Sequence, residues 1–283
     1  MTNNDQKTAV AVNTMSDKQE TRSLAELSMT QKLATADFLQ ILQCGTIEVQ
    51  GLLPWSSNYT FLTRLRHELT PGRLLTAEAV YKPRRGERPL WDFAQGTLCQ
   101  RELAAFLVSE ALGWGIVPPT VLRDGPNGVG SIQLFIDHDP ERHYFTFEGS
   151  PRLQPQLQRI ALLDVIINNA DRKSGHILLQ EAETLDQVGR LWGIDHGICF
   201  HVDHKLRTVV WEFAEWPIPE KMLVAMRQLQ LALANPTSSL SQQLRQYLAE
   251  RELTALLARV CRLLETAVFP NPGPGRHYPW PPI

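Results

Sequence analysis

Short segments in which apolar and polar residues alternate dominate residues 46–136 of this 283-residue chain. Alternation with a period of two is typical of β-strands, and turn residues such as Pro71-Gly72 and Gly125-Pro126-Asn127-Gly128 separate the segments. The pattern predicts a small antiparallel sheet of five strands, placed at Thr46–Leu53, Tyr59–His67, Leu74–Tyr81, Thr120–Leu122 and Val129–Ile136.

Two segments in this first part have apolar residues at helical spacing instead. A short helix is predicted over Ala36–Gln43, with Thr35 as its N-cap and Gly45 just past its end. A longer helix is predicted to run to about Leu112, because Thr97-Leu98-Cys99-Gln100 has the spacing of a capping box at its start. We expect this longer helix to pack on the sheet.

The second part of the chain is predicted to be mainly helical, so that the whole is an α+β fold of two lobes. A hairpin of two short strands interrupts the helices, and a further segment has a strand-like composition. The predicted helices are Gln154–Ile167, Glu220–Ala234 and Ser238–Ala267, the hairpin strands are Ile177–Leu179 and Leu191–Ile194, and the strand-like segment is Thr208–Phe213.

Changes in composition set the expected domain boundaries. Asp137–Arg142 is polar and without periodicity, as expected of a linker, so we place an upper lobe over residues 23–137 and a lower lobe over residues 138–269. Residues 1–22 are rich in Asn, Asp, Thr, Lys and Gln and are predicted to be a disordered arm. The Pro-rich residues 270–283 are predicted to form an extended strap or a flexible end.

Composition and charge exclude several classes of protein. A hydrophobic fraction of 43% suffices for a sizeable core, and a net charge of −2 argues against a protein that coats nucleic acid. The four cysteines are scattered and form no Cys-x-x-Cys pair, which favours free thiols in a reducing compartment. The chain has no apolar run that could span a bilayer and no signal-peptide core, so we expect a cytoplasmic protein without stable membrane insertion.

The segment from Asp164 to Phe200 carries the candidate chemistry. Asp171 follows the predicted helix that ends at Ile167, and Asp195 follows the second strand of the hairpin. The hairpin would therefore place two carboxylates side by side. Phosphoryl transfer requires this arrangement, because one carboxylate orients the attacking hydroxyl and the other holds the metal that bridges the nucleotide phosphates.

The motifs in this segment resemble the catalytic and metal-binding loops of phosphatidylinositol 3-/4-kinase-like proteins, most closely type II phosphatidylinositol 4-kinases and a bacterial subgroup of that family. The similar parts are Asp-x-Ile-Ile-x-Asn-x-Asp-Arg, which ends at Arg172, and the later Ile194-Asp195-x-Gly197. Ala79-Val80-Tyr81-Lys82-Pro83, continuing through Gly86-Glu87-Arg88-Pro89, is similar to the strand that carries the nucleotide-binding lysine in the same group. The resemblance implies a two-lobed, protein-kinase-like fold.

The resemblance assigns roles in the lower lobe residue by residue. Asp171 matches the catalytic aspartate and Asp195 the metal-binding aspartate. His176 lies where active relatives carry a metal-binding asparagine, so this chain departs from ordinary two-magnesium chemistry. For Arg172 two roles stay open, which are balancing the charge of a transferring phosphate and stiffening the loop as a salt-bridge partner. Asp164 lies in an apolar helix, and we expect it to bond to the loop backbone.

In the upper lobe the resemblance implies that Lys82 neutralises phosphate charge and that a helical carboxylate holds it in place. Glu102 borders the apolar stripe of its helix and is the preferred partner. Glu110 is the competitor, and stabilisation of the helix dipole is the structural alternative for Glu102. The tip of the first hairpin lacks a glycine triplet, but Ser56, Ser57 and Asn58 are candidates for phosphate contacts there.

The sequence predicts an ATP-binding kinase that uses Mg²⁺ or Mn²⁺ and transfers a phosphoryl group to a protein or small-molecule hydroxyl, less readily to a lipid. The adenine would lie against residues Gln133–Asp137. AMP transfer by the same residues is a variant of this hypothesis. One alternative is a pseudokinase that binds nucleotide as an interaction module. A second is a zinc hydrolase that combines Asp171 and Asp195 with the nearby histidines, which are His143, His176, His196, His201 and His204.

Overall fold

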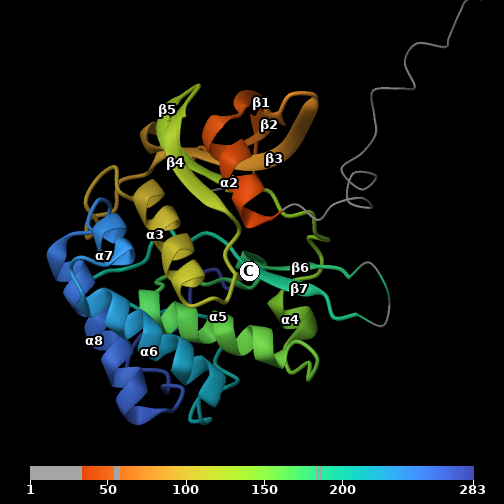
Figure 1. Cartoon of the computed structure of the whole chain (residues 1–283). Helices are drawn as coiled ribbons and strands as arrows, with labels where there is room; N and C mark the ends of the chain where they lie inside the picture. The colour runs from red at the N-terminus through yellow and green to blue at the C-terminus, as the bar shows by residue number, and fades with distance from the viewer. Residues whose placement is uncertain (1–33, 54–57, 183, 185–186) are drawn as a thin grey trace, which may run out of the picture.

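An antiparallel sheet of five strands forms the upper lobe of the protein (Figure 1). The computed structural model describes residues 34–53, 58–182, 184 and 187–283, so the predicted arm over residues 1–22, the expected start of order near Ser23, and Ser56 and Ser57 lie outside the described residues. The strand order is β1-β2-β3-β5-β4, which confirms the predicted five-stranded sheet. The strands are β1 (Thr46–Leu52), β2 (Phe61–Thr70), β3 (Arg73–Pro83), β4 (Thr120–Gly125) and β5 (Gly128–Leu134).

The two helices of the first part form where the sequence predicts them, but their caps differ. Helix α2 (Thr35–Cys44) begins one residue earlier, because the N-cap is Ala34, whose N–H donates to Asp37; the N-cap prediction for Thr35 was wrong. Helix α3 (Leu98–Ala111) has no capping box, because the Thr97 hydroxyl donates to Ala94 instead. The carboxylate of Glu87 accepts hydrogen bonds from the first two N–H groups of α3 and takes the place of the predicted cap.

The lower lobe is mainly helical, and helix α5 (Gln154–Ile167) runs through its centre (Figure 1). The hairpin of β6 (Ile177–Gln180) and β7 (Arg190–Gly193) forms as predicted. The remaining helices are α4 (Tyr144–Phe147), α6 (Glu220–Ala234), α7 (Ser239–Leu244) and α8 (Glu250–Thr266), together with the 3-10 turns η1 (Arg84–Gly86) and η2 (Ser174–His176).

Two predictions for the lower lobe were wrong. The single helix expected over Ser238–Ala267 is divided into α7 and α8, because Glu252 accepts from the N–H of Ala249 and starts a new helix there. Residues Thr208–Phe213 form no strand. Thr208 instead donates its hydroxyl to Asp164 and accepts the N–H of Val210, so tertiary contacts override the local β-propensity.

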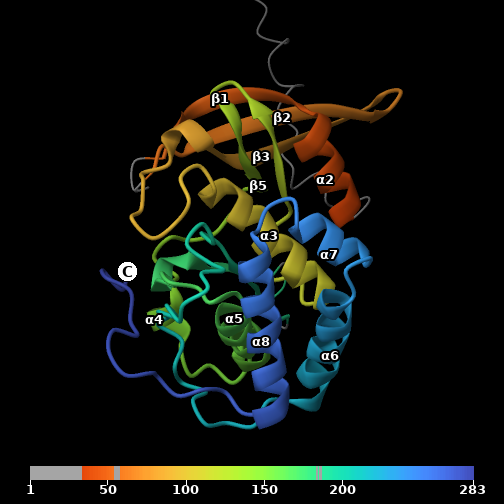
Figure 2. The same cartoon turned by 90° about the vertical axis from the view of Figure 1, so that its left-hand side faces the viewer.

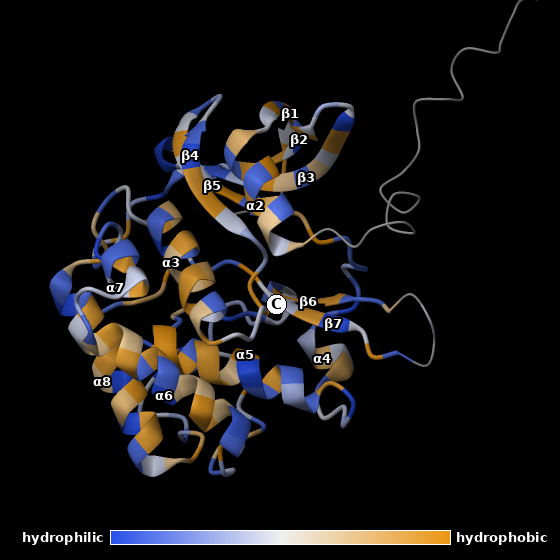
Figure 3. Cartoon of the chain, in the orientation of Figure 1, coloured by the Kyte–Doolittle hydropathy of each residue, from blue (hydrophilic) through white to orange (hydrophobic). Residues whose placement is uncertain are grey.

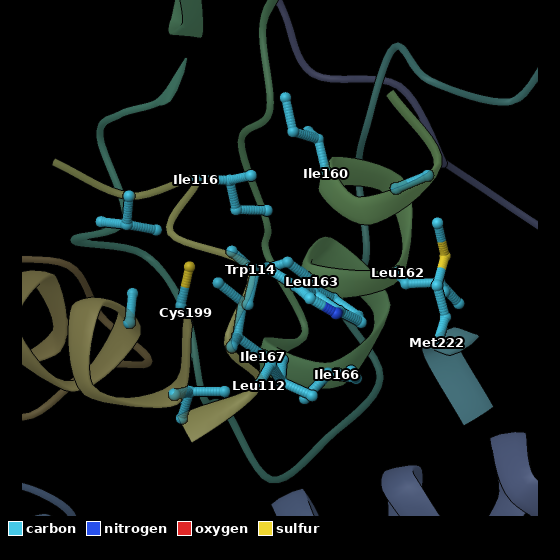
Figure 4. Packing of buried hydrophobic residues seen from close by; sticks show 14 of the residues in the cluster. Leu112, Trp114, Ile116, Ile160, Leu162, Leu163, Ile166, Ile167, Cys199 and Met222 are labelled. Carbon is cyan, nitrogen blue, oxygen red and sulfur yellow. The ribbon is translucent and has the colours of Figure 1, made fainter. Parts of the chain in front are cut away.

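The larger hydrophobic core joins α3 to the lower lobe. Phe106 of α3 belongs to the same buried cluster as Leu157 of α5, Met226 of α6 and Leu256 of α8. Figure 3 shows hydrophobic residues gathered where α3, α5 and α8 lie close together. Figure 4 shows side chains that follow α3, such as Trp114, against those of α5. The sheet has a smaller core of its own, to which α2 contributes Ile41 and Leu42. Helix α3 contacts β4 and β5 of the sheet as well as the lower lobe.

None of the helices in the described part of the chain is both long and apolar enough to cross a bilayer.

Candidate active site

Lys82 joins the two lobes at the inner edge of the sheet. It lies near the end of β3, and its Nζ lies 2.5 Å from Glu102 Oε1 and 2.9 Å from Asp195 Oδ1. Burial alone would lower the pKa of Lys82, but the two carboxylates outweigh it and raise that pKa above its ordinary value. Lys82 is therefore a fixed cation, and the predicted convergence of Lys82, Glu102 and Asp195 is present in the structure.

Glu102, rather than Glu110, faces the site. Its side chain is 3% exposed, and its second oxygen accepts the N–H of His196 at 2.9 Å. One carboxylate thus links the lysine of the upper sheet to the residue that follows Asp195. Glu110 lies on the outside of α3, where Arg190 is the nearby charge.

Arg101, which the sequence analysis did not single out, fixes α3 to the lower lobe. Its guanidinium is 3% exposed and donates to the carbonyl of Cys199 and to Glu252 of α8, each at 2.6 Å. Arg101 and Glu102 therefore hold the two ends of the loop that carries Asp195. No local pattern could reveal this contact, because Glu252 lies 151 residues further along the chain.

Arg172 is a structural residue of the loop that carries Asp171. Its side chain is fully buried and donates to Asp164 from Nε at 3.1 Å and from Nη2 at 3.0 Å. It also donates to the carbonyl of Ile194, next to Asp195, at 2.7 Å. The catalytic role predicted for Arg172 is thus corrected in favour of the salt-bridge role, because a guanidinium with no exposed surface cannot reach a substrate. It ties the two carboxylate loops together.

Asp164 bonds mainly to side chains, whereas the sequence analysis expected a bond to the loop backbone. Besides Arg172, its carboxylate accepts from Asn169 Nδ2 at 2.9 Å and from the Thr208 hydroxyl at 3.2 Å. The helix ends at Asn168, which adopts the left-handed conformation with φ of 53°. The donors from Arg172, Asn169 and Thr208 together compensate the buried negative charge of Asp164.

Asp171 differs from Asp195 in its partners, because no cation among the described residues hydrogen-bonds to the Asp171 carboxylate, whereas Lys82 donates to Asp195. Its side chain is 28% exposed, and Lys173 Nζ lies 3.8 Å away. Burial, reinforced by the negative charge of Asp195, raises the pKa of Asp171 to about 6 against the opposing charge of Lys173. A carboxylate with such a pKa accepts a proton near neutral pH more readily than an ordinary aspartate.

Asp195 and His176 form a pair suited to a metal ion. His176 Nε2 lies 3.3 Å from Asp195 Oδ2, and His176 Nδ1 lies 2.9 Å from the carbonyl oxygen of Asp171. Nδ1 also lies 3.4 Å from the N–H of Lys173, but the Asp171 carbonyl is closer and can only accept, which favours a proton on Nδ1. Nε2 then presents a lone pair to the carboxylate. Two acceptors face each other, and a bound cation would satisfy both.

The pKa shifts of His176 and Asp195 agree with a metal-binding role for this pair. Burial lowers the pKa of His176 to about 4 despite the opposing effect of Asp195, so the ring is neutral at pH 7. Burial would raise the pKa of Asp195, but Lys82 above all holds it well below the ordinary range. A neutral imidazole and an ionised carboxylate are the forms that bind metals. Asp195 also has a φ of 60°, a left-handed conformation that is uncommon for residues other than glycine.

The residues predicted to contact adenine border a small apolar cluster between the lobes. Ile136 packs with Leu178 and Trp192 of the β6–β7 hairpin, and Leu134 and Ile194 lie against this group. Apolar side chains of this kind suit the flat face of a base. Within the predicted strip Gln133 does not face a ligand, because its side-chain amide is buried and donates to Thr120.

The other predicted site residues that the structure describes, Asn58, His201 and His204, have partners outside the carboxylate pair. Asn58 accepts the N–H of Arg88 through Oδ1 at 2.9 Å, so its amide supports the hairpin. His201 contacts the carbonyl of Asp92 and His204 lies beside Gly273, and neither joins the carboxylate pair. Among residues 34–53, 58–182, 184 and 187–283, no group of three or more His, Cys, Asp or Glu side chains is arranged to hold a metal ion. The zinc-hydrolase alternative, which needs three protein ligands, stays a prediction that metal analysis of the purified protein would test.

Comparison with known proteins agrees with the fold and the motifs. The model of the family described as "Phosphatidylinositol 3- and 4-kinase" matches residues 122–264. Protein Rv2133c of Mycobacterium tuberculosis is 40% identical over 274 residues, which cover 85% of this chain and 94% of that protein. Phosphatidylinositol 4-kinase gamma 4 of rice is 35% identical over 135 residues, which cover 41% of this chain and only 22% of the rice protein.

The fold itself is shared with a solved kinase-like structure. Hydra Fam20, solved with sugar, superposes with a TM-score of 0.54 at 15% identity and covers 82% of this chain and 88% of the Fam20 chain. The two-lobed kinase-like fold predicted from the sequence is confirmed, as is the resemblance to phosphatidylinositol 4-kinases and to a bacterial relative.

Proposed function

Because this chain belongs to the phosphatidylinositol 3- and 4-kinase family, we propose that it transfers the terminal phosphoryl group of ATP to a hydroxyl of a protein or small-molecule acceptor. Family and fold support a phosphotransferase. The observation that carries the proposal is the contact of Lys82 Nζ with Glu102 Oε1 and Asp195 Oδ1 at 2.5 and 2.9 Å. The Lys82 ammonium of the upper sheet thus contacts Asp195, the carboxylate that would bind the metal.

Each residue of the cluster has a definite task in this proposal. Lys82 neutralises phosphate oxygens, and Glu102 keeps its ammonium in place. Asp171 orients the acceptor hydroxyl and takes its proton. Asp195 and His176 would hold a divalent metal, which when bound neutralises charge that develops on the phosphate oxygens. The buried bonds of Arg172 keep the Asp171 and Asp195 loops at a fixed spacing.

Transfer of label from ATP tests the proposal. The purified protein is incubated with γ-labelled ATP and Mg²⁺ or Mn²⁺, with dephosphorylated casein, inositol or phosphatidylinositol vesicles as acceptors. We expect label on casein or inositol, or slow release of labelled phosphate, and loss of either in Lys82→Met. Absence of both with either metal would refute the proposal. Label transferred from α-labelled ATP would instead indicate AMP transfer.

A nucleotide-binding pseudokinase is the second candidate, because a histidine occupies a position where active relatives carry the metal-binding amide. In the same preparation this candidate predicts an increase in melting temperature with ATP and metal but no transfer or hydrolysis. Melting curves recorded beside the labelling assay separate the two functions.

The metal preference of the protein should depend on His176. Imidazole nitrogen favours Mn²⁺ relative to Mg²⁺, whereas an amide oxygen favours Mg²⁺. We expect His176→Asn to lower the ratio of Mn²⁺-supported to Mg²⁺-supported kcat/KM by about tenfold, the scale on which changes at metal sites act. His67→Asn, on β2 and beside Gln40, is the matched control. An unchanged ratio would exclude His176 as a ligand.

Activity should decline on the acid side because Asp171 must be ionised to accept a proton. Its pKa is raised to about 6, so the active form is complete above that pH and is lost as the pH falls through it. We expect kcat/KM to fall about tenfold for each pH unit below 6, as for loss of a single essential base. A profile of kcat/KM that stays flat from pH 5 to pH 8 would contradict this role.

A further inference from the structure

The C-terminal residues 270–283 run along the lower lobe and end beside η2, where the N–H of Ser174 donates to the carbonyl of Pro282. In Figure 2 the segment leaves the lower end of α8 and rises at the left to the C-terminus. Gly273 lies beside His204, where an added Cβ would be 3.6 Å from Nε2. The term strap denotes residues 270–283 below.

The strap is held by its main-chain carbonyls. The carbonyl of His277 accepts from the N–H of Thr208 at 3.1 Å and from Trp211 Nε1 at 3.3 Å. Near the end of the chain, the carbonyl of Pro282 accepts from the N–H of Ser174 at 2.8 Å. Three donors on the lower lobe therefore recognise an extended backbone. Two side chains of the strap add contacts, since Asn271 Nδ2 donates to Glu215 at 2.7 Å and the His277 ring lies against Trp211.

Several side chains of the strap are exposed, as expected of a segment that another ligand of the lower lobe can displace. Trp280 is 77% exposed, Ile283 64% and Tyr278 45%, whereas Pro279 is buried. These exposed side chains bury little apolar area against the lower lobe, so they contribute little to holding the strap in place. Six prolines keep the strap extended and remove backbone donors, and they are Pro270, Pro272, Pro274, Pro279, Pro281 and Pro282.

The three donors lie next to the residues assigned to the transfer reaction. Ser174 is three residues from Asp171. Thr208 forms an isolated β-bridge with Arg172, the residue after Asp171. Arg276 of the strap is near enough for its charge to act on the Asp171 carboxylate. The strap therefore lies beside the loop that carries Asp171.

We propose that the surface formed by residues 173–174 and 204–211 is a groove for an extended polypeptide acceptor, and that the strap occupies this groove as a tethered competitor. The inference rests on the proposed phosphotransferase function and names its acceptor class. The strap contains no serine or threonine, and its only hydroxyl belongs to Tyr278, whose neighbour His277 is bonded to the groove. It thus resembles an acceptor backbone without an aliphatic hydroxyl.

Peptide binding tests the groove independently of catalysis. The probe is a fluorescein-labelled peptide of residues 271–283, and its polarisation is titrated with the full chain and with a chain shortened after Gly275. We expect saturable binding to the shortened chain and binding at least about tenfold weaker to the full chain, because a tethered strap competes at high effective concentration. No saturable binding to the shortened chain, or equal binding to both, would overturn the proposal.

Two tryptophans provide a matched pair of variants in the shortened chain. Trp211→Phe removes the indole donor that the strap uses, and we expect it to weaken the peptide about fivefold, the loss of one hydrogen bond. Trp216→Phe makes the same chemical change at an aromatic residue that packs on Phe213, and we expect no change. Equal effects of the two changes would overturn the assignment of the groove.

A kinetic arm separates this inference from the proposed function. With dephosphorylated casein as acceptor, the shortened chain should show a lower KM for casein and an unchanged KM for ATP. Labelling of inositol alone, with no gain on casein, would refute the polypeptide acceptor but leave the phosphotransferase intact. Absence of turnover in either form would refute the phosphotransferase, and the peptide titration would still decide the groove.

If the shortened chain does not fold, hydrogen exchange in the full-length variants decides the question. We expect the amides of Ser174 and Thr208 to exchange faster in Trp211→Phe than in Trp216→Phe, since these amides donate to the strap. Equal protection in the two variants would overturn the exchangeable contact.

Discussion

Asp171→Asn is expected to reduce phosphoryl transfer by about 10² to 10⁴, the range over which a positioned proton acceptor contributes. The amide keeps the shape of the side chain but cannot take a proton from the acceptor. Nucleotide affinity should change little, because Asp171 makes no hydrogen bond to Lys82 or Asp195. Initial rates with γ-labelled ATP and a separate nucleotide titration measure the two quantities.

The control for this change is Asp203→Asn, which removes an aspartate that is 80% exposed in the neighbouring loop. We expect its rate to stay close to that of the unaltered protein. A rate for Asp171→Asn within about threefold of the control would be too small for a lost proton acceptor and would exclude the assigned role. A parallel loss of nucleotide affinity would assign Asp171 to binding rather than to the chemical step.

Arg172→Met is expected to lower the free energy of unfolding by about 3–5 kcal/mol, because it leaves the Asp164 carboxylate charged and buried without its partner. Both side chains of this ion pair are fully buried. Urea denaturation followed by circular dichroism measures the change. The double variant Asp164→Leu with Arg172→Met should recover part of the loss, since neither charge then remains unpaired.

Arg227→Met is the matched control for stability. Arg227 pairs with Glu220 at 2.8 Å, but both side chains are more than half exposed, so the pair should contribute no more than about 1 kcal/mol. If Arg172→Met cost as little as Arg227→Met, the buried network would not be what holds the two carboxylate loops.

Much of the fold and of the candidate site could be predicted, because the signals were local. The alternation of β1 to β5 and the apolar helix α5 follow from periodicities of two and 3.6 residues. Lys82 and Glu102 lie at the strand end and on the helix face where the sequence analysis placed them. Their contact across the cleft then followed from the expected packing of α3 on the sheet.

The errors arose where distant contacts decide the outcome. Thr208 has the composition of a strand residue, yet its hydroxyl and backbone serve Asp164 and the strap. Arg172 could not be assigned to one role, because only the fold shows that its guanidinium is enclosed. Arg101 carried no motif at all, and its partners lie in α8 and after Asp195.

The anchoring of α3 has a consequence for regulation. Arg101 and the hydrophobic core fix this helix to the lower lobe, so Glu102 is held toward Lys82 without a further ligand. Regulation of activity would then act on the binding of the acceptor rather than on the position of α3. The position of the strap beside the loop of Asp171 agrees with this division.

The central claim is that Lys82, Asp171 and Asp195 converge on one nucleotide. The most direct measurement is a crystal structure with a non-hydrolysable ATP analogue and Mn²⁺, with the metal located by anomalous scattering. We expect the Mn²⁺ peak at bonding distance from Asp195 and His176, with phosphate oxygens against Lys82. A metal peak away from Asp195, or a nucleotide whose phosphates do not reach Lys82, would contradict the account.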